Sequence, residues 1–191
     1  MPTPFLTRRS ALITAAAGLA TAASAPASQA AACGDAGTIL LTVGGLIEKL
    51  NRAPFYAKRD PFFQHNNLRF DRARTFSRAD LAALGCEAAS SEVDGAKRVF
   101  EGPSLRAVLA AASPTAEAKA ARLYALDSYA AEFPLADIAA QNWILSFSEG
   151  GIPYAIGNYG PLRLVRETSG KLSEEEAQKW VHSIFYIEII G

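Results

Sequence analysis

The sequence contains few of the side chains that most often carry chemistry in small proteins. Its 191 residues include two cysteines, two histidines and one methionine. The histidines, His65 and His182, do not have the spacing of a metal-ligand pair, and the chain has no C-x-x-C, H-E-x-x-H, P-loop or dinucleotide-binding glycine motif. A Ser-His-Asp order is missing as well. Hydrolases and nucleotide-dependent enzymes therefore have no support in the sequence.

An excess of one charge and long apolar runs are also missing. Lys and Arg number 19, and Asp and Glu number 19, so the net charge is zero. This balance argues against nucleic acid or an anionic membrane as the main partner. The apolar run at residues 13–23 is rich in Ala and shorter than the roughly 20 strongly apolar residues of a membrane-spanning helix. We therefore expect no nucleic-acid partner and no transmembrane span after signal removal.

The N-terminus has the layout of a bacterial secretory signal. Arg8 and Arg9 precede the apolar run, and small residues follow at 25–32. Adjacent arginines favour the twin-arginine route, which exports proteins already folded and often loaded with a cofactor. We predict that residues 1–32 are a cleaved signal peptide and that residues 33–191 are a periplasmic domain. That mature chain would carry 17 basic and 19 acidic residues.

The two cysteines, Cys33 and Cys86, leave three alternatives open. In an oxidising compartment they can pair and tether the mature N-terminus to the domain. Alternatively, Cys33 is the lipidated first residue of a lipoprotein, although the alanines at 30–32 lack the usual bulky apolar residue. In the third alternative both cysteines are free thiols.

Short strand patterns separated by turn signals dominate residues 33–191. About 160 residues suit one domain with a sizeable core. The sequence predicts a single mixed α+β domain, dominated by strands and with a few short helices. Strands are expected at residues 38–43, 68–71, 86–93, 97–100, 123–128, 132–134, 143–148, 152–156, 162–165 and 180–190, and a further helical turn at 135–140.

Three serines mark expected helix starts. Ser77 is followed by Asp80 in the first turn, and Ser173 is followed by Glu176 at the capping-box position. Ser104 precedes a run with apolar residues on one face.

Two connections stand out between these elements. Asp94-Gly95 is the strongest hairpin-turn dipeptide and joins strands 86–93 and 97–100. The stretch 51–67 is rich in Pro, Phe and charge, and it reads as a long surface loop whose aromatic side chains fold back onto the core. It is a candidate lid, or a local excursion without a functional role.

Four pieces of sequence, taken in order, carry a family resemblance. They are Phe100-x-Gly102-x-x-Leu105-x-x-x-Leu109, then Ala125-Leu126-Asp127-x-Tyr129-x-x-x-Phe133-Pro134-Leu135-x-Asp137, then Gly160-Pro161-Leu162-Arg163-Leu164-Val165, then Trp180-Val181-His182-Ser183-Ile184-Phe185-Tyr186-Ile187-Glu188. By their order and spacing, the chain resembles the small exported proteins built on the molybdopterin-binding domain of the sulfite oxidase superfamily. The resemblance runs over about residues 38–190 and implies the fold of that domain.

The resemblance also implies a molybdopterin cofactor, with molybdenum held by the pterin dithiolene and by one cysteine thiolate. In the family, that cysteine lies about fourteen residues before the glycine that matches Gly102, which here is the position of Ala88. Cys86 is two positions away, on the same face of a strand, and is the candidate metal ligand. Small family members often lack this cysteine, so the cofactor is absent in the alternative.

If a pterin or another anion binds, five polar residues at strand ends and in loops are the candidate contacts. They are Ser90, Asp127, Tyr129, Asn158 and Arg163. Arg163 can hold a phosphate through its planar fork. The structural alternatives are a turn for Asp127, a core position for Tyr129, a left-handed backbone for Asn158, and an ion pair with Glu188 or another acid for Arg163.

Two hypotheses follow for the function. In the first, the protein is an exported oxidoreductase-type domain that binds a molybdopterin-like ligand in a periplasmic redox system. In the second, it is a non-enzymatic binding module on the same fold, without the metal-ligating cysteine, that serves a redox or signalling partner protein. Fold analogy alone does not decide between an enzyme and a binding module.

Overall fold

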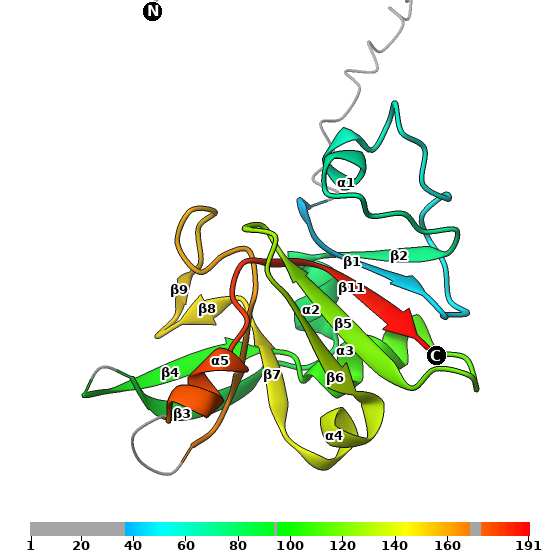
Figure 1. Ribbon diagram of the computed structural model, residues 1–191. Coiled ribbons are helices and arrows are strands. Elements are labelled where there is room, and N and C mark those ends of the chain that lie inside the picture. Colours follow the sequence, from blue (N-terminus) through cyan, green and yellow to red (C-terminus); the bar gives the residue numbers. More distant parts are fainter. Residues whose placement is uncertain (1–36, 94, 169–172) are drawn as a thin grey trace, which may run out of the picture. The chain divides into compact units, whose positions relative to one another are not determined.

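The first and last strands of the described chain lie side by side. In the computed structural model, which describes residues 37–93, 95–168 and 173–191, β1 (Ile39–Gly45) pairs in parallel with β11 (Ile184–Ile190) (Figure 1). Parallel pairing needs a long connection, and here the connection is almost the whole domain. The predicted signal peptide, Cys33 and the Asp94 half of the predicted turn lie outside the described residues.

The described strands form three sheets around this pair. Besides β1 and β11 they are β2 (Ala73–Ser77), β3 (Glu87–Val93), β4 (Ala96–Gly102), β5 (Ala120–Ala125), β6 (Ala130–Pro134), β7 (Trp143–Ser146), β8 (Ser148–Glu149), β9 (Ile152–Pro153) and β10 (Arg163–Arg166). The largest sheet has the order β2-β1-β11-β5-β6, the second the order β3-β4-β8-β9, and the third pairs β10 with β7. The predicted hairpin of the second sheet is confirmed, with Ala89 opposite Phe100.

Five short helices are described between the strands, and serine caps start three of them. The helices are α1 (Pro61–His65), α2 (Arg78–Ala83), α3 (Leu105–Ala112), α4 (Leu135–Ala140) and α5 (Glu174–Gln178). Ser77 and Ser173 form capping boxes with Asp80 and Glu176, and the Ser104 hydroxyl accepts the Ala107 N–H at 3.3 Å. The three predicted starts are confirmed because each serine satisfies a backbone donor that a helix leaves free.

The main core lies where the faces of the sheets meet α3. Leu41 of β1, Leu123 of β5 and Leu164 of β10 have no exposed area there. In β5 the buried residues alternate with half-buried ones, as the strand pattern predicts. The strand-dominated α+β class expected from the sequence is confirmed.

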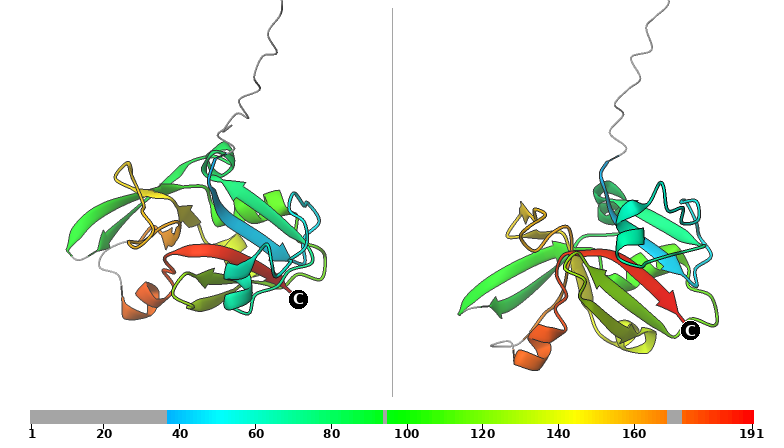
Figure 2. Two further views of the ribbon diagram at one scale, coloured as in Figure 1. Left: turned by 90° about the horizontal axis from the view of Figure 1, so that it is seen from above. Right: turned by 45° about the horizontal axis from the view of Figure 1, so that its top comes forward.

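A second, aromatic cluster lies under the 51–67 segment. Phe63 packs edge-on against Phe70 and Tyr186, and α1 lies over β11 (Figure 2). The Arg52 guanidinium lies 4.8 Å and 4.7 Å from the Phe63 and Phe70 ring centres. The predicted return of these aromatic side chains onto the core is confirmed for Phe55 and Phe63, whereas Tyr56 and Phe62 are exposed and the expected loop contains the helix α1. A lid role stays a prediction.

Several predicted strands differ from the structure. The strand expected at 123–128 ends at Ala125, because residues 126–128 form a turn, and the strand expected at 143–148 is divided at Phe147 into β7 and β8. Residues 68–71 form no strand, and the neighbouring strand is β2 instead, because Leu68 and Phe70 are buried in the aromatic cluster rather than paired along a sheet. The closing strand begins at Ile184 rather than Trp180, since Ser183 has a left-handed backbone with φ of 56°. The arm expected at 152–156 is only the two residues of β9. Within the described ranges, no helix is both long and apolar enough to traverse a bilayer.

Candidate functional site

The β5–β6 turn brings together two of the predicted site residues. Ser128 takes a left-handed backbone with φ of 70°, and the Tyr129 N–H donates to the Asp127 carboxylate at 3.1 Å. Both side chains line a cleft of about 260 Å³ whose opposite wall includes Trp180 and His182. The Tyr129 hydroxyl donates to the Gln178 carbonyl of α5 at 3.3 Å, so this turn also supports the helix.

A second cleft, of about 340 Å³, adjoins the first and shares Tyr129 and Gln178 with it. Its other walls include Trp143 of β7, Arg166 of β10 and Lys179 after α5. We call the two together the Tyr129 cleft. Their combined size is in the range of small-molecule sites in proteins.

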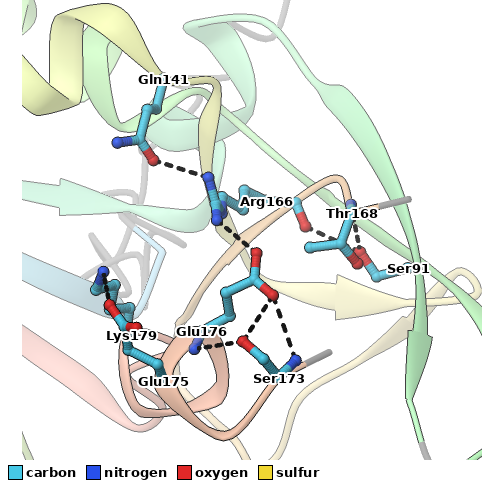
Figure 3. Close-up of polar contacts among 8 residues, drawn as sticks. All are labelled: Ser91, Gln141, Arg166, Thr168, Ser173, Glu175, Glu176 and Lys179. Atoms are coloured by element: carbon cyan, nitrogen blue, oxygen red, sulfur yellow. Dashed lines mark hydrogen bonds and ion pairs between the residues drawn. The ribbon is translucent and has the colours of Figure 1, made fainter. Parts of the chain in front are cut away.

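A polar network holds one wall of the Tyr129 cleft in place (Figure 3). The Arg166 guanidinium donates to Gln141 at 3.0 Å and to Glu176 at 2.7 Å, and it lies 5.4 Å from the Trp143 ring centre. Glu176 accepts from both the hydroxyl and the backbone N–H of Ser173. These Ser173 hydrogen bonds, and then the charge of Arg166, lower the pKa of Glu176. The carboxylate therefore stays ionised and keeps α5 beside β10.

Ser91 anchors the chain that leaves β10. Its hydroxyl donates to the Arg166 carbonyl at 2.9 Å and accepts the Thr168 N–H at 3.2 Å (Figure 3). Ser91 is buried on the same face of β3 as Ala89, because successive strand residues point to opposite faces. The Ser91 hydroxyl on the buried face of β3 therefore holds the backbone of Arg166, whose side chain forms the polar network.

Three N–H donors at the Tyr129 cleft are buried without an acceptor. The indole N–H groups of Trp143 and Trp180 and the Nε–H of Arg166 find no partner among the described residues. A buried donor left unpaired costs about 1–3 kcal/mol and is rare in native proteins. Because these nitrogen atoms have almost no accessible area, they lie behind the surface of the cleft rather than on it.

Cys86 lies apart from this cleft. It is exposed, it directly precedes β3, and it is not among the residues that line the Tyr129 cleft. Successive strand residues point to opposite faces, so Cys86 lies on the same face as the exposed Ala88 and on the opposite face from the buried Ser91. In the part of the chain that is described, no group of three or more His, Cys, Asp and Glu side chains could hold a metal ion.

The other predicted contacts lie in separate places. Ser90 lines a cleft of about 220 Å³ on β3 and β4, and Asn158 one of about 210 Å³ with Glu149 and Tyr159. Arg163 is buried under three aromatic rings, with its guanidinium 4.1 Å from the Tyr159 ring centre and 3.9 Å from the Glu149 carboxylate. The structure therefore groups Asp127 with Tyr129 only. Glu188, the acid considered for Arg163, instead accepts from the Tyr124 hydroxyl at 2.8 Å.

Several residues of the cleft were not predicted from the sequence, above all Arg166, Gln141, Trp143 and Lys179. One signal was available. Arg163 and Arg166 are the first and last residues of β10. Residues three apart on a strand point to opposite faces, so only one of the two arginines can face the core. No local sequence pattern indicates that residues of α4 and α5 line the cleft.

Comparison with known proteins gives a relation at the level of fold. No protein-family model matches the sequence, and no curated protein is significantly similar to it. Among the solved structures that resemble this one is the crystal structure of the sulfane dehydrogenase SoxCD from Paracoccus pantotrophus, with a TM-score of 0.51 and 18% sequence identity. The similarity covers 79% of this chain and 38% of that chain, so this protein spans well under half of its neighbour's length. At this level of identity the similarity shows a shared fold over the matched region.

Proposed function

We propose that this protein is an exported component of a periplasmic redox system that binds a molybdopterin-like ligand in the Tyr129 cleft. The observation that carries the proposal is the lining of the Tyr129 cleft, which combines aromatic rings with the Arg166 guanidinium. The fold relation to a dehydrogenase structure supports a ligand of redox chemistry.

The cleft residues fit the organic part of such a ligand. A pterin presents ring nitrogen and oxygen acceptors together with a phosphate, and the Arg166 guanidinium in the lining of the cleft would bind the phosphate. The exposed ring of Tyr129 offers a face on which a flat heterocycle stacks. When bound, a molybdopterin supplies two-electron redox chemistry, and this chain's residues would bind and orient it.

The residues of the cleft do not fit the metal equally well. A molybdenum centre of this kind takes a protein thiolate, and Cys86 is exposed and outside the cleft. This position favours a second candidate function. In it, the protein is a non-enzymatic binding module on the same fold that serves a redox or signalling partner protein.

Ligand analysis of the full chain, produced through its own export route in a molybdenum-replete bacterial host, tests both candidates. Pterin is measured by fluorescence after oxidation, and molybdenum by elemental analysis. We expect pterin to copurify, and its content to fall in Trp143→Phe, which removes the indole N–H and part of the ring that lines the cleft, and in Arg166→Gln. Arg106→Gln, on exposed α3 surface, is the matched control.

The Cys86→Ala variant separates the two candidates. Stoichiometric molybdenum that is lost in this variant supports the oxidoreductase with Cys86 as ligand. Folded protein with neither pterin nor molybdenum contradicts the ligand proposal and leaves the binding module.

Export needs its own measurement. In cell fractionation we expect the chain in the periplasm, shortened near residue 32 by N-terminal sequencing. An Arg8→Lys, Arg9→Lys double variant should accumulate unprocessed in the cytoplasm. Normal processing of that variant would contradict the twin-arginine route.

A further inference from the structure

A more apolar cleft, larger than either half of the Tyr129 cleft, lies away from it and shares no lining residue with it. It measures about 550 Å³ and lies between the start of β1, the outer face of α2 and the segment 154–161. Its apolar walls are Leu40, Ala79, Ala82, Ile156 and Pro161. This volume is within the range of small-molecule sites.

The sequence of α2 explains why this cleft is open. Ala79 and Ala82 are three residues apart and so share one helix face, whereas Leu81 points into the core with no exposed area. An alanine side chain ends at Cβ, so the face that carries Ala79 and Ala82 leaves room above it.

The opposite wall exposes apolar surface. Ile156 is 78% exposed, in a stretch, 150–162, that contains no charged residue. The surrounding turn is fixed by two backbone hydrogen bonds to the Ala155 carbonyl, from Asn158 at 3.2 Å and from Gly160 at 3.1 Å. A ligand that removes this fixed isoleucine side chain from water is stabilised by the hydrophobic effect.

Among the described residues, one charged side chain lines the cleft, and it is a cation. Arg78 lies with its guanidinium 4.3 Å from the Phe147 ring centre and donates to the Phe147 carbonyl at 3.4 Å. No carboxylate among the described residues forms an ion pair with Arg78, and none lines the cleft. The cleft therefore combines apolar walls with a single uncompensated positive charge.

We propose that this cleft binds a small amphiphile with one anionic head group and an apolar body, such as a fatty-acid carboxylate. The Arg78 fork takes the head group, and Ala79, Ala82 and Ile156 cover the apolar body. The site is independent of the ligand proposed for the Tyr129 cleft.

Titration calorimetry of the full chain with dodecanoate tests this proposal. Dodecanol and dodecylamine are the uncharged and cationic comparison ligands. We expect saturable one-to-one binding of dodecanoate that is at least about tenfold tighter than binding of either comparison ligand, because a charge-assisted hydrogen bond contributes about 1.5–3 kcal/mol.

Two variants locate the binding. Arg78→Gln should weaken dodecanoate binding about tenfold and leave dodecanol binding unchanged, whereas Ala82→Trp fills the cleft and should abolish both. Arg106→Gln is the matched control, since Arg106 also makes a single carbonyl contact at 3.4 Å. Circular dichroism confirms that each variant is folded. Non-saturable binding, equal binding of dodecylamine, or unchanged binding in Arg78→Gln and Ala82→Trp would overturn the proposal.

Discussion

The Arg166 guanidinium lies 2.7 Å from the Glu176 carboxylate, and this ion pair ties β10 to a helix that has no buried residue of its own. A helix of five residues without apolar packing is not stable in isolation. Helix α5, which forms part of both halves of the Tyr129 cleft, therefore depends on polar contacts.

The first prediction concerns this ion pair. Glu176→Gln removes the charge that holds Arg166 but keeps a side-chain oxygen that can close the Ser173 capping box, so we expect the α5 amides to exchange hydrogen about two- to fivefold faster through loss of the ion pair. Hydrogen exchange followed by mass spectrometry measures this. Lys179→Gln, which breaks only the exposed Glu175–Lys179 pair, is the control and should change exchange little. Equal effects of the two variants would show that Arg166 does not hold the helix.

The second prediction concerns Ser91. Ser91→Ala leaves the Arg166 carbonyl and the Thr168 N–H without their buried partner, and we expect a loss of about 1–3 kcal/mol in unfolding free energy. Urea unfolding measures it. Ser90→Ala, on the other face of β3, is the matched control and should change stability by less than about 0.5 kcal/mol.

The third prediction is a loss of stability in acid through Asp60. Burial alone raises the pKa of Asp60, but hydrogen bonds from the Tyr56 N–H, Arg59 and Arg52 outweigh burial and hold the pKa at about 2. A carboxyl whose folded pKa lies below its unfolded value of 3.8 stabilises the fold above that value. The contribution is lost as the pH falls from about 5 to about 2.

The size of this effect is limited by water, since Arg59 is half exposed and screening weakens the pair. We expect the wild type to lose about 1 kcal/mol more than Asp60→Asn between pH 6 and pH 3 in urea unfolding. Parallel pH profiles of the two proteins would contradict this assignment.

The fourth prediction concerns Gly102, where β4 passes close to β7. A Cβ at this position would overlap the Leu145 carbonyl oxygen and lie 2.8 Å from the Ser146 Cα. Gly102→Ala should therefore cost about 2–4 kcal/mol, because the two closely packed backbones must move apart.

Gly157→Ala is the comparison for Gly102→Ala. Gly157 has a φ of 95° but nothing within 4 Å of its Cβ position, so only backbone strain of about 1 kcal/mol opposes alanine there. Thermal unfolding of both variants distinguishes overlap from strain, and equal losses would argue against the close approach at Gly102.

Much of the local structure could be predicted because its causes are local. The capping boxes of Ser77 and Ser173 each close within one helical turn, and the α4 helix has the predicted bounds, residues 135–140. The pair of Asp127 with Tyr129 could also be predicted to lie at a strand end, since both belong to one turn. The predicted strand start at Trp180 was wrong because the left-handed backbone of Ser183 has no reliable signal in sequence.

The sequence alone determined the strand-dominated α+β class, most element positions, and the scarcity of metal-ligating residues, since these depend on composition and short-range pattern. Only the tertiary structure decided which polar groups share a cleft. Arg166, Gln141 and Glu176 come from three elements, and their meeting depends on how β10, α4 and α5 pack. The same packing buries Arg163 under aromatic rings and leaves Cys86 in solvent, because the burial of each side chain depends on contacts between residues far apart in the chain.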